Sequence, residues 1–122
     1  MIDWRRSPKN TREVWEYLKN EAVKKMRVVT YSEVAEYVGD KVGHEIAPIS
    51  IAQPLGFIRD EICKKHNLPL INVLVVNKNT SFPGESFLPN EIEADCYFRK
   101  RIWRLTVVEV FLYPWETFVV ND

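Results

Sequence analysis

Cysteine, histidine and glycine are scarce in this chain of 122 residues, which contains two, two and four of them. The cysteines, Cys63 and Cys96, stand apart without the spacing of a disulfide or metal pair, so free thiols are expected. The histidines, His44 and His66, have no partner at ligand spacing, which argues against a metal site. A glycine-rich phosphate loop and a Ser-His-Asp arrangement are also missing. The sequence therefore predicts a protein without a cofactor, a bound metal or an enzymatic activity.

Long apolar runs are absent as well. No stretch approaches the length that a membrane-spanning helix requires. The first six residues, Met1–Arg6, lack the apolar centre of a signal peptide. We therefore expect a soluble protein of the cytoplasm with no membrane partner.

The formal net charge is zero, because seventeen basic residues balance seventeen acidic ones. Proteins dedicated to nucleic acids are more often basic, so this balance counts against that role. The charge is unevenly placed, however. Residues 1–27 hold eight Lys or Arg against four acids, whereas residues 28–62 hold two against six. A second basic cluster, which would form either a phosphate-binding or a solvated face, consists of Arg99, Lys100, Arg101 and Arg104.

The content of apolar and charged residues predicts one folded domain. Apolar residues make up 46% of the chain and charged residues 28%, which is enough for a core and argues against disorder. Neither a linker nor a repeat divides residues 1–122. The first nine residues, 1–9, are predicted to form an N-terminal arm that Trp4 anchors and Pro8 ends.

Apolar spacing predicts helices in the first half of the chain. A first helix begins at Asn10 or Thr11 and runs to about Lys25, with an inward stripe at spacings of four. A second spans Thr30–Gly39, "TYSEVAEYVG". Its start carries the Thr and Glu of a capping box, and Gly39 is expected to end it. The inward stripe of the first helix comprises Val14, Leu18 and Ala22, with Met26 as its next position, and that of the second comprises Val34, Ala35 and Val38.

A third helix is predicted over Ser50–His66, or from Pro54 onward, since proline fits a first helical position. Gly56 in mid-helix costs about 1 kcal/mol relative to alanine. That cost indicates the close approach of a neighbouring helix or a ligand. The buried stripe of this helix comprises Ile51, Leu55, Ile58 and Ile62.

The second half of the chain predicts a hairpin. An apolar strand ends at Val76, a polar turn follows over 77–84, and a weaker strand returns around Glu85–Leu88. A final helix runs from Glu91 to about Phe111, although its later part is also strand-like in composition. The expected fold is thus α+β and winged helix-turn-helix-like: a helical core with a small β-hairpin and a C-terminal helix.

Three segments resemble one family of DNA repair proteins. "TYSEVAEYVG", "AQPLGFIRDEICKKHNLPL" and "VLVVNKNTSFPGESF" are similar, in order and spacing, to the helix-turn-helix and wing of the alkylguanine-DNA alkyltransferases and their alkyltransferase-like relatives. The resemblance covers about residues 28–88. It implies a winged-helix domain that binds double-stranded DNA. The last segment also resembles small uncharacterised bacterial and phage proteins, a similarity that implies no activity.

The resemblance assigns roles residue by residue. Tyr31 matches the tyrosine that, with a helix arginine, handles a phosphate and a rotated base. Gly56 matches the helix glycine, but Gln53 stands where the family has that arginine. The reactive Pro-Cys-His-Arg signature is replaced by the sequence of residues 70–75, Leu-Ile-Asn-Val-Leu-Val. Without a thiolate no alkyl group can be accepted, so the resemblance implies binding without transfer.

Seven residues are candidate DNA contacts. Tyr31 would meet a phosphate or base at a helix N-terminus, and Gln53 would read a base. Each also has an ordinary interpretation, in which Tyr31 packs, the third helix shows a solvated face and residues 77–80 form a plain turn. The complete set is Tyr31, Ser50, Gln53, Arg59, Lys64, Lys78 and Asn79.

Two functions follow from these observations. The first is a non-catalytic DNA-binding module whose affinity falls with salt. The alternative is a protein-interaction module of the same fold from a phage or mobile element, for example an inhibitor or adaptor of a host system that handles nucleic acids. In that case the acidic middle segment and exposed aromatic residues would contact a protein.

Overall fold

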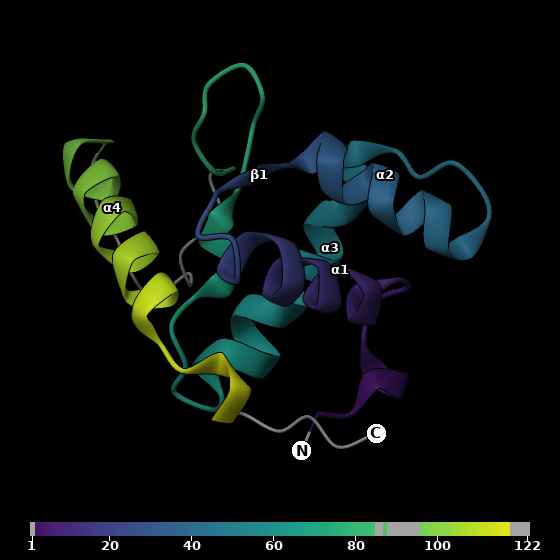
Figure 1. Cartoon of the computed structure of the whole chain (residues 1–122), viewed down its shortest axis with the longest axis horizontal. Coiled ribbons are helices and arrows are strands. Elements are labelled where there is room, and N and C mark those ends of the chain that lie inside the picture. Colours follow the sequence, from purple (N-terminus) through teal and green to yellow (C-terminus); the bar gives the residue numbers. More distant parts are fainter. Residues whose placement is uncertain (1, 85–86, 88–95, 118–122) are drawn as a thin grey trace.

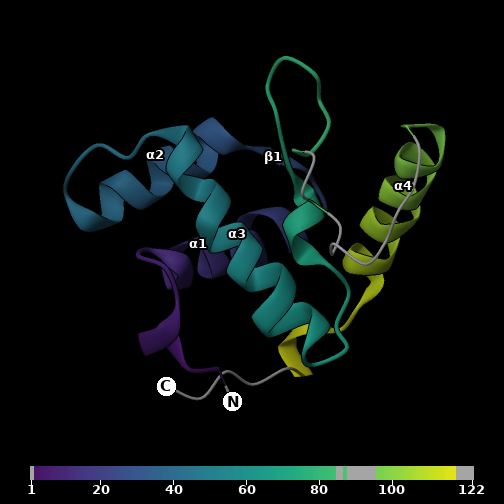
Figure 2. The same ribbon diagram turned by 180° about the vertical axis from the view of Figure 1, so that it is seen from behind.

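The computed structural model describes residues 2–84, 87 and 96–117 and shows an α+β fold that is mostly helical (Figures 1 and 2). Within these residues, none of the helices combines the length and apolar character needed to cross a bilayer. The main elements are α1 (Thr11–Tyr17), β1 (Val29–Thr30), α2 (Tyr31–Val42), α3 (Ala52–Phe57), β2 (Val75–Val76) and α4 (Cys96–Leu112). Short 3-10 and π-helical turns complete them: η1 (Trp4–Arg6), η2 (Leu18–Val23), η3 (Pro48–Ile51), η4 (Ile58–Lys64), η5 (Ile71–Leu74) and η7 (Trp115–Thr117).

The first helix is longer than α1 alone, because η2 extends it. Val14, Leu18 and Ala22 are completely buried, which confirms the stripe at spacings of four. The stripe does not reach Met26, which is exposed and adopts a positive φ of 51°. That left-handed residue turns the chain away from the helix and toward β1.

The start of α2 is a capping box. The Glu33 N–H donates to Thr30 Oγ1 at 3.1 Å, and the Thr30 N–H donates to Glu33 Oε1 at 3.3 Å, as expected. The predicted end at Gly39 is wrong, since the helix continues to Val42 and Gly43 takes the left-handed cap at φ 84°. Gly39 serves another purpose. A Cβ atom there would lie 3.0 Å from the carbonyl oxygen of His44, so glycine lets the following loop fold back onto the helix.

The third helix is built from η3, α3 and η4 in succession. It begins in the 3-10 turn at Pro48 rather than at Ser50 and ends at Lys64. All four residues of its predicted stripe are buried, which confirms the orientation of the helix in the core: Ile51, Leu55, Ile58 and Ile62.

The sheet of the described residues consists of two parallel strands. β1 pairs with β2 in the register Val29 with Val75 and Thr30 with Val76. The expected partner of β2, a return strand at Glu85–Leu88, lies outside the described residues except for Phe87. The part of the predicted strand before Val75 is wrong, because residues 71–74 form the buried 3-10 turn η5. Only two residues remain extended, and these pair with β1.

The segment Asn77–Gly84 forms a loop that projects from the end of β2, beside the start of α2 and the first turns of α4 (Figures 1 and 2). Its base is closed by the Asn77 N–H, which donates to the Phe82 carbonyl at 2.9 Å. The Ser81 N–H returns a bond to the Asn77 carbonyl at 2.8 Å. These bonds hold the polar tip away from the core.

Helix α4 lies along η5. Its strand-like part is helical, so the alternative of a strand after Leu105 is wrong. Trp103 Nε1 donates to the Val73 carbonyl at 2.8 Å, and Val110 is completely buried, which fixes one face of the helix on the core. The expected start at Glu91 lies outside the described residues. The opposite face exposes apolar side chains: Phe98, Leu105, Val108 and Leu112.

Replacement of Ile58 by alanine tests the assignment of the core. Ile58 has no exposed surface, so Ile58→Ala should lower the free energy of unfolding by about 2–5 kcal/mol. The control is Ile49→Ala on the preceding turn, where 84% of the side chain is exposed and a change within about 0.5 kcal/mol is expected. Urea denaturation measures both. Equal stabilities of the two variants would contradict the assignment.

Candidate functional site

A small pocket of about 150 Å³ opens where α2, the third helix, η5 and the projecting loop meet. Tyr31 is the first residue of α2, Gly56 lies within α3, and Asn72 lies on η5. The pocket therefore collects residues from separate parts of the chain. Its wall consists of Tyr31, Ala52, Leu55, Gly56, Arg59, Asn72, Gly84 and Phe87.

One hydrogen bond joins the loop to α2 at this pocket. The Gly84 N–H donates to the Tyr31 hydroxyl oxygen at 3.2 Å. A Cβ atom at position 84 would lie 3.1 Å from that oxygen, so a side chain there would press on the tyrosine. Glycine at the end of the loop therefore permits the contact, and the contact fixes where the loop stands.

Asn72 is the unusual polar group of the pocket. Its side chain is 5% exposed and its Nδ2 donates to the Phe87 carbonyl at 2.9 Å. Its Oδ1 atom has no hydrogen-bond partner among the described residues. A buried acceptor without a partner costs about 1–3 kcal/mol. Such a group needs an explanation, and one explanation is a ligand that donates to it.

Arg59 lines the pocket, and its guanidinium is paired with Asp60. Its side chain is 11% exposed and forms a bidentate bond with Asp60, from Nε to Oδ1 at 2.7 Å and from Nη2 to Oδ2 at 2.6 Å. The hydrogen bond from Arg59 holds the pKa of Asp60 below its usual range. Because the carboxylate balances the guanidinium, Arg59 presents a planar wall rather than a net positive charge.

Gly56 leaves the pocket open. Apart from the chain neighbours and the backbone of the same helix, the atom nearest to a Cβ added at Gly56 would be Arg59 Nη2, at 4.0 Å. The neighbouring helix that could have explained this glycine does not approach it. The glycine instead forms part of the pocket wall.

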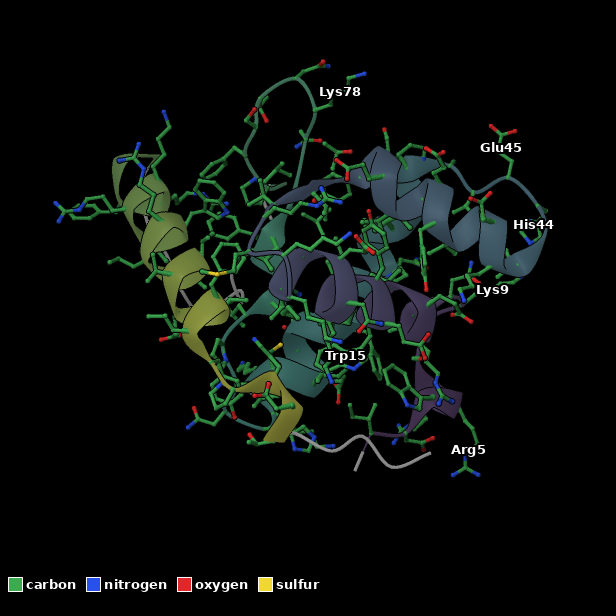
Figure 3. The ribbon with its side chains drawn as sticks, viewed as in Figure 1. Arg5, Lys9, Trp15, His44, Glu45 and Lys78 are labelled. Carbon is green, nitrogen blue, oxygen red and sulfur yellow. The ribbon has the colours of Figure 1, made fainter. Side chains whose placement is uncertain are left out.

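The other candidate DNA contacts are exposed residues that do not line the pocket. Ser50 and Gln53 are exposed at the start of the third helix, on either side of the pocket residue Ala52. Lys78 and Asn79 are exposed on the projecting loop, where Figure 3 shows Lys78 pointing away from the core. Lys64 is exposed but ends the same helix, at the opposite end from Ser50. The structure thus brings Tyr31 and Arg59 together and leaves Lys64 apart.

The basic segment of α4 reaches the pocket through one contact. The Arg99 guanidinium lies 4.9 Å from the centre of the Phe87 ring, in the geometry of a cation–π interaction. Phe87 in turn lines the pocket and meets Phe82 of the loop edge-to-face, with ring centres 5.5 Å apart. Lys100, Arg101 and Arg104 are exposed on the same helix.

The described wall of this pocket carries a phenol and a guanidinium, from Tyr31 and Arg59, but no thiol, imidazole, amine or carboxylate. Cys63 is buried elsewhere, and burial raises the pKa of its thiol to about 12. The thiol therefore stays protonated and unreactive near neutral pH. The side chain of Cys96 lies outside the described residues. The described residues also include no cluster of three His, Cys, Asp or Glu that would hold a metal ion.

Asn72 and Phe87 line the pocket but are not among the site residues predicted from the sequence. Asn72 carries the signal that would have revealed it, since it is the one amide in the apolar run of residues 70–76. A polar residue in such a run is either satisfied internally or faces a ligand. No comparable signal exists for Phe87, because only the fold brings it to the pocket.

Neither protein-family models, nor curated protein sequences, nor solved structures give a match to this chain.

Replacement of Gly56 by alanine tests whether the pocket is open. The added methyl group meets open space and raises helix propensity, so Gly56→Ala should stabilise the protein by about 0.5–1 kcal/mol. Gly39→Ala is the matched control within a helix, because its methyl group would lie 3.0 Å from a backbone oxygen and should destabilise. Thermal unfolding compares the two variants. Destabilisation by both would show that the space at Gly56 is filled.

Proposed function

We propose that this protein is a non-catalytic DNA-binding module of the winged-helix type, acting in the cytoplasm, with Asn77–Gly84 as its wing. One observation carries the proposal. The projecting loop and the exposed first turns of the third helix flank the same pocket, and the bond between Tyr31 and Gly84 fixes the loop to the start of α2 beside it. With the loop on one side of the pocket and the start of the third helix on the other, this face could contact both a groove and the backbone of a duplex.

The exposed side chains on this face suit the two kinds of DNA contact. Ser50 and Gln53 are uncharged donors and acceptors that can meet base edges, and Gln binds adenine in a bidentate way. Lys78 and Asn79 on the loop suit phosphate oxygens. The basic segment of α4 would add phosphate contacts from the other side of the loop, where Arg99 contacts Phe87 of the pocket wall.

The resemblance to the alkyltransferase-like proteins agrees with this assignment. Tyr31 and Gly56, the two positions that match the family, both line the pocket. Asn72 lies in the stretch where the family carries its reactive Pro-Cys-His-Arg sequence, and an amide does not accept an alkyl group. The proposed module therefore binds DNA and releases it unchanged.

Replacement of Lys78 by alanine tests the wing. Lys78 is the one basic residue among residues 77–84, so Lys78→Ala should weaken binding about equally for all duplex sequences. The slope of log affinity against log salt should decrease by about 0.9, the value of one phosphate contact. Stability should not change, because the side chain is exposed. Fluorescence anisotropy with a labelled duplex at several salt concentrations gives the slope.

The matched control is Lys9→Ala, which removes an exposed charge that lies away from the projecting loop, just before α1 (Figure 3). Its salt slope should equal that of the parent protein. Equal slopes for Lys78→Ala and the parent would contradict a wing at residues 77–84.

The exposed apolar face of α4 favours a second function, a protein-interaction module from a phage or mobile element. Phe98, Leu105 and Leu112 recur every seven residues, and more than half of each side chain is exposed. Such a stripe is typical of a protein interface. Under this alternative the partner is a component of a system that handles nucleic acids. The absence of a mobility shift with duplex DNA at low salt would favour it.

A further inference from the structure

The exposed apolar face of α4 has the spacing of a helix that pairs with another helix. Phe98, Leu105 and Leu112 are seven residues apart, and Val108 lies between the last two, so the face follows the seven-residue repeat of a coiled-coil seam. More than half of each of these side chains is exposed. Single apolar residues on a surface are ordinary, whereas a stripe of them along one helix face indicates an interface.

Opposite charges lie on the two edges of this stripe. Arg104 directly precedes Leu105, Glu109 directly follows Val108, and both charged side chains are exposed. Since successive residues of a helix turn by about 100°, the guanidinium and the carboxylate lie on opposite edges. They are five residues apart in the sequence, which is the separation at which the edge residues of two parallel, paired helices meet.

The charges of the stripe are complementary to those of a second copy when the two helices run parallel. In a parallel pair with two-fold symmetry, the Arg104 edge of each helix faces the Glu109 edge of the other, which gives two identical ion pairs. In an antiparallel pair each edge would face its own copy, so like charges would meet. A face that matches itself in both apolar spacing and edge charge indicates a second copy of this chain as its partner.

We propose that this chain forms a parallel homodimer with two-fold symmetry through the exposed apolar face of α4, in which Arg104 pairs with Glu109 of the partner subunit. Arg101, which is exposed, holds the remaining position of the seam. Its methylene groups can stay in the seam while its guanidinium reaches solvent, at a cost in affinity. The dimer should therefore dissociate on dilution.

The dimer does not depend on the proposed DNA binding, because none of these α4 residues lines the pocket. It would nevertheless extend that function. In Figure 1 the N-terminal end of α4 and the projecting loop lie at the same end of the molecule. A two-fold axis along α4 would place both loops at one end of the dimer, where they could meet two half-sites of one duplex.

Replacement of Leu105 by aspartate tests the seam. Leu105 is 70% exposed, so Leu105→Asp should leave the fold intact but place a charge against the second copy. Sedimentation equilibrium between about 1 µM and about 1 mM should show a monomer–dimer equilibrium for the parent protein and a dissociation constant at least roughly tenfold higher for the variant. Ile49→Asp is the matched control, because it adds the same charge at an exposed isoleucine on η3 and should not change the dissociation constant.

Exchange of the edge charges tests the parallel orientation. Arg104→Glu and Glu109→Arg should each weaken the dimer by about three- to tenfold, because each converts two attractive pairs into repulsive ones. The double variant R104E/E109R restores opposite charges and should return the dissociation constant to within about twofold of the parent value. Thermal unfolding followed by circular dichroism checks that the variants remain folded.

The outcomes separate this inference from the proposed function. A dimer that does not bind duplex DNA would support the inference and remove only the DNA-binding function. A parent protein that stays monomeric at about 1 mM would overturn the inference and leave the face to a different protein. A dimer that Leu105→Asp does not weaken would overturn it as well, since another surface would then form the interface. Single charge variants that associate as strongly as the parent would exclude the parallel pairing.

Discussion

The short parallel ladder between β1 and β2 is the constraint on which the site depends. Pairing of Thr30 with Val76 aligns the end of one strand with the end of the other. Since α2 begins directly after β1 and the loop begins directly after β2, the ladder sets Tyr31 beside the loop. The bond from the Gly84 N–H to the Tyr31 hydroxyl then closes the loop onto α2. Two strand residues on each side thereby position the whole candidate interface.

Two features of the pocket beside this ladder reduce stability. Gly56 gives up helix propensity although a methyl group would fit, and Asn72 buries an acceptor without a partner among the described residues. Each feature costs stability of the order of 1 kcal/mol or more. A ligand that fills the space and donates to Asn72 would offset both costs.

Local interactions explain what the sequence predicts well. The capping box of Thr30 and Glu33 joins residues three apart, and the stripe that includes Ile58 follows the helical repeat, so both can be inferred from spacing alone. The bond between Tyr31 and Gly84 joins residues 53 apart, and each pair of the ladder between β1 and β2 joins residues 46 apart, so neither leaves a local pattern. The hairpin was expected because the turn residues after Val76 are typical of one, but η5 withdraws the preceding residues from the sheet.

The central claim is that the face around the pocket contacts DNA, and amide chemical-shift mapping with a short duplex tests it most directly. At low salt the account predicts shifts that cluster at the start of α2, in the third helix near Gly56, and along the loop at Lys78 and Asn79. Added salt should reverse them, because phosphate contacts dominate the affinity. Shifts confined to the exposed apolar face of α4, or no shifts at any salt concentration, would contradict the account.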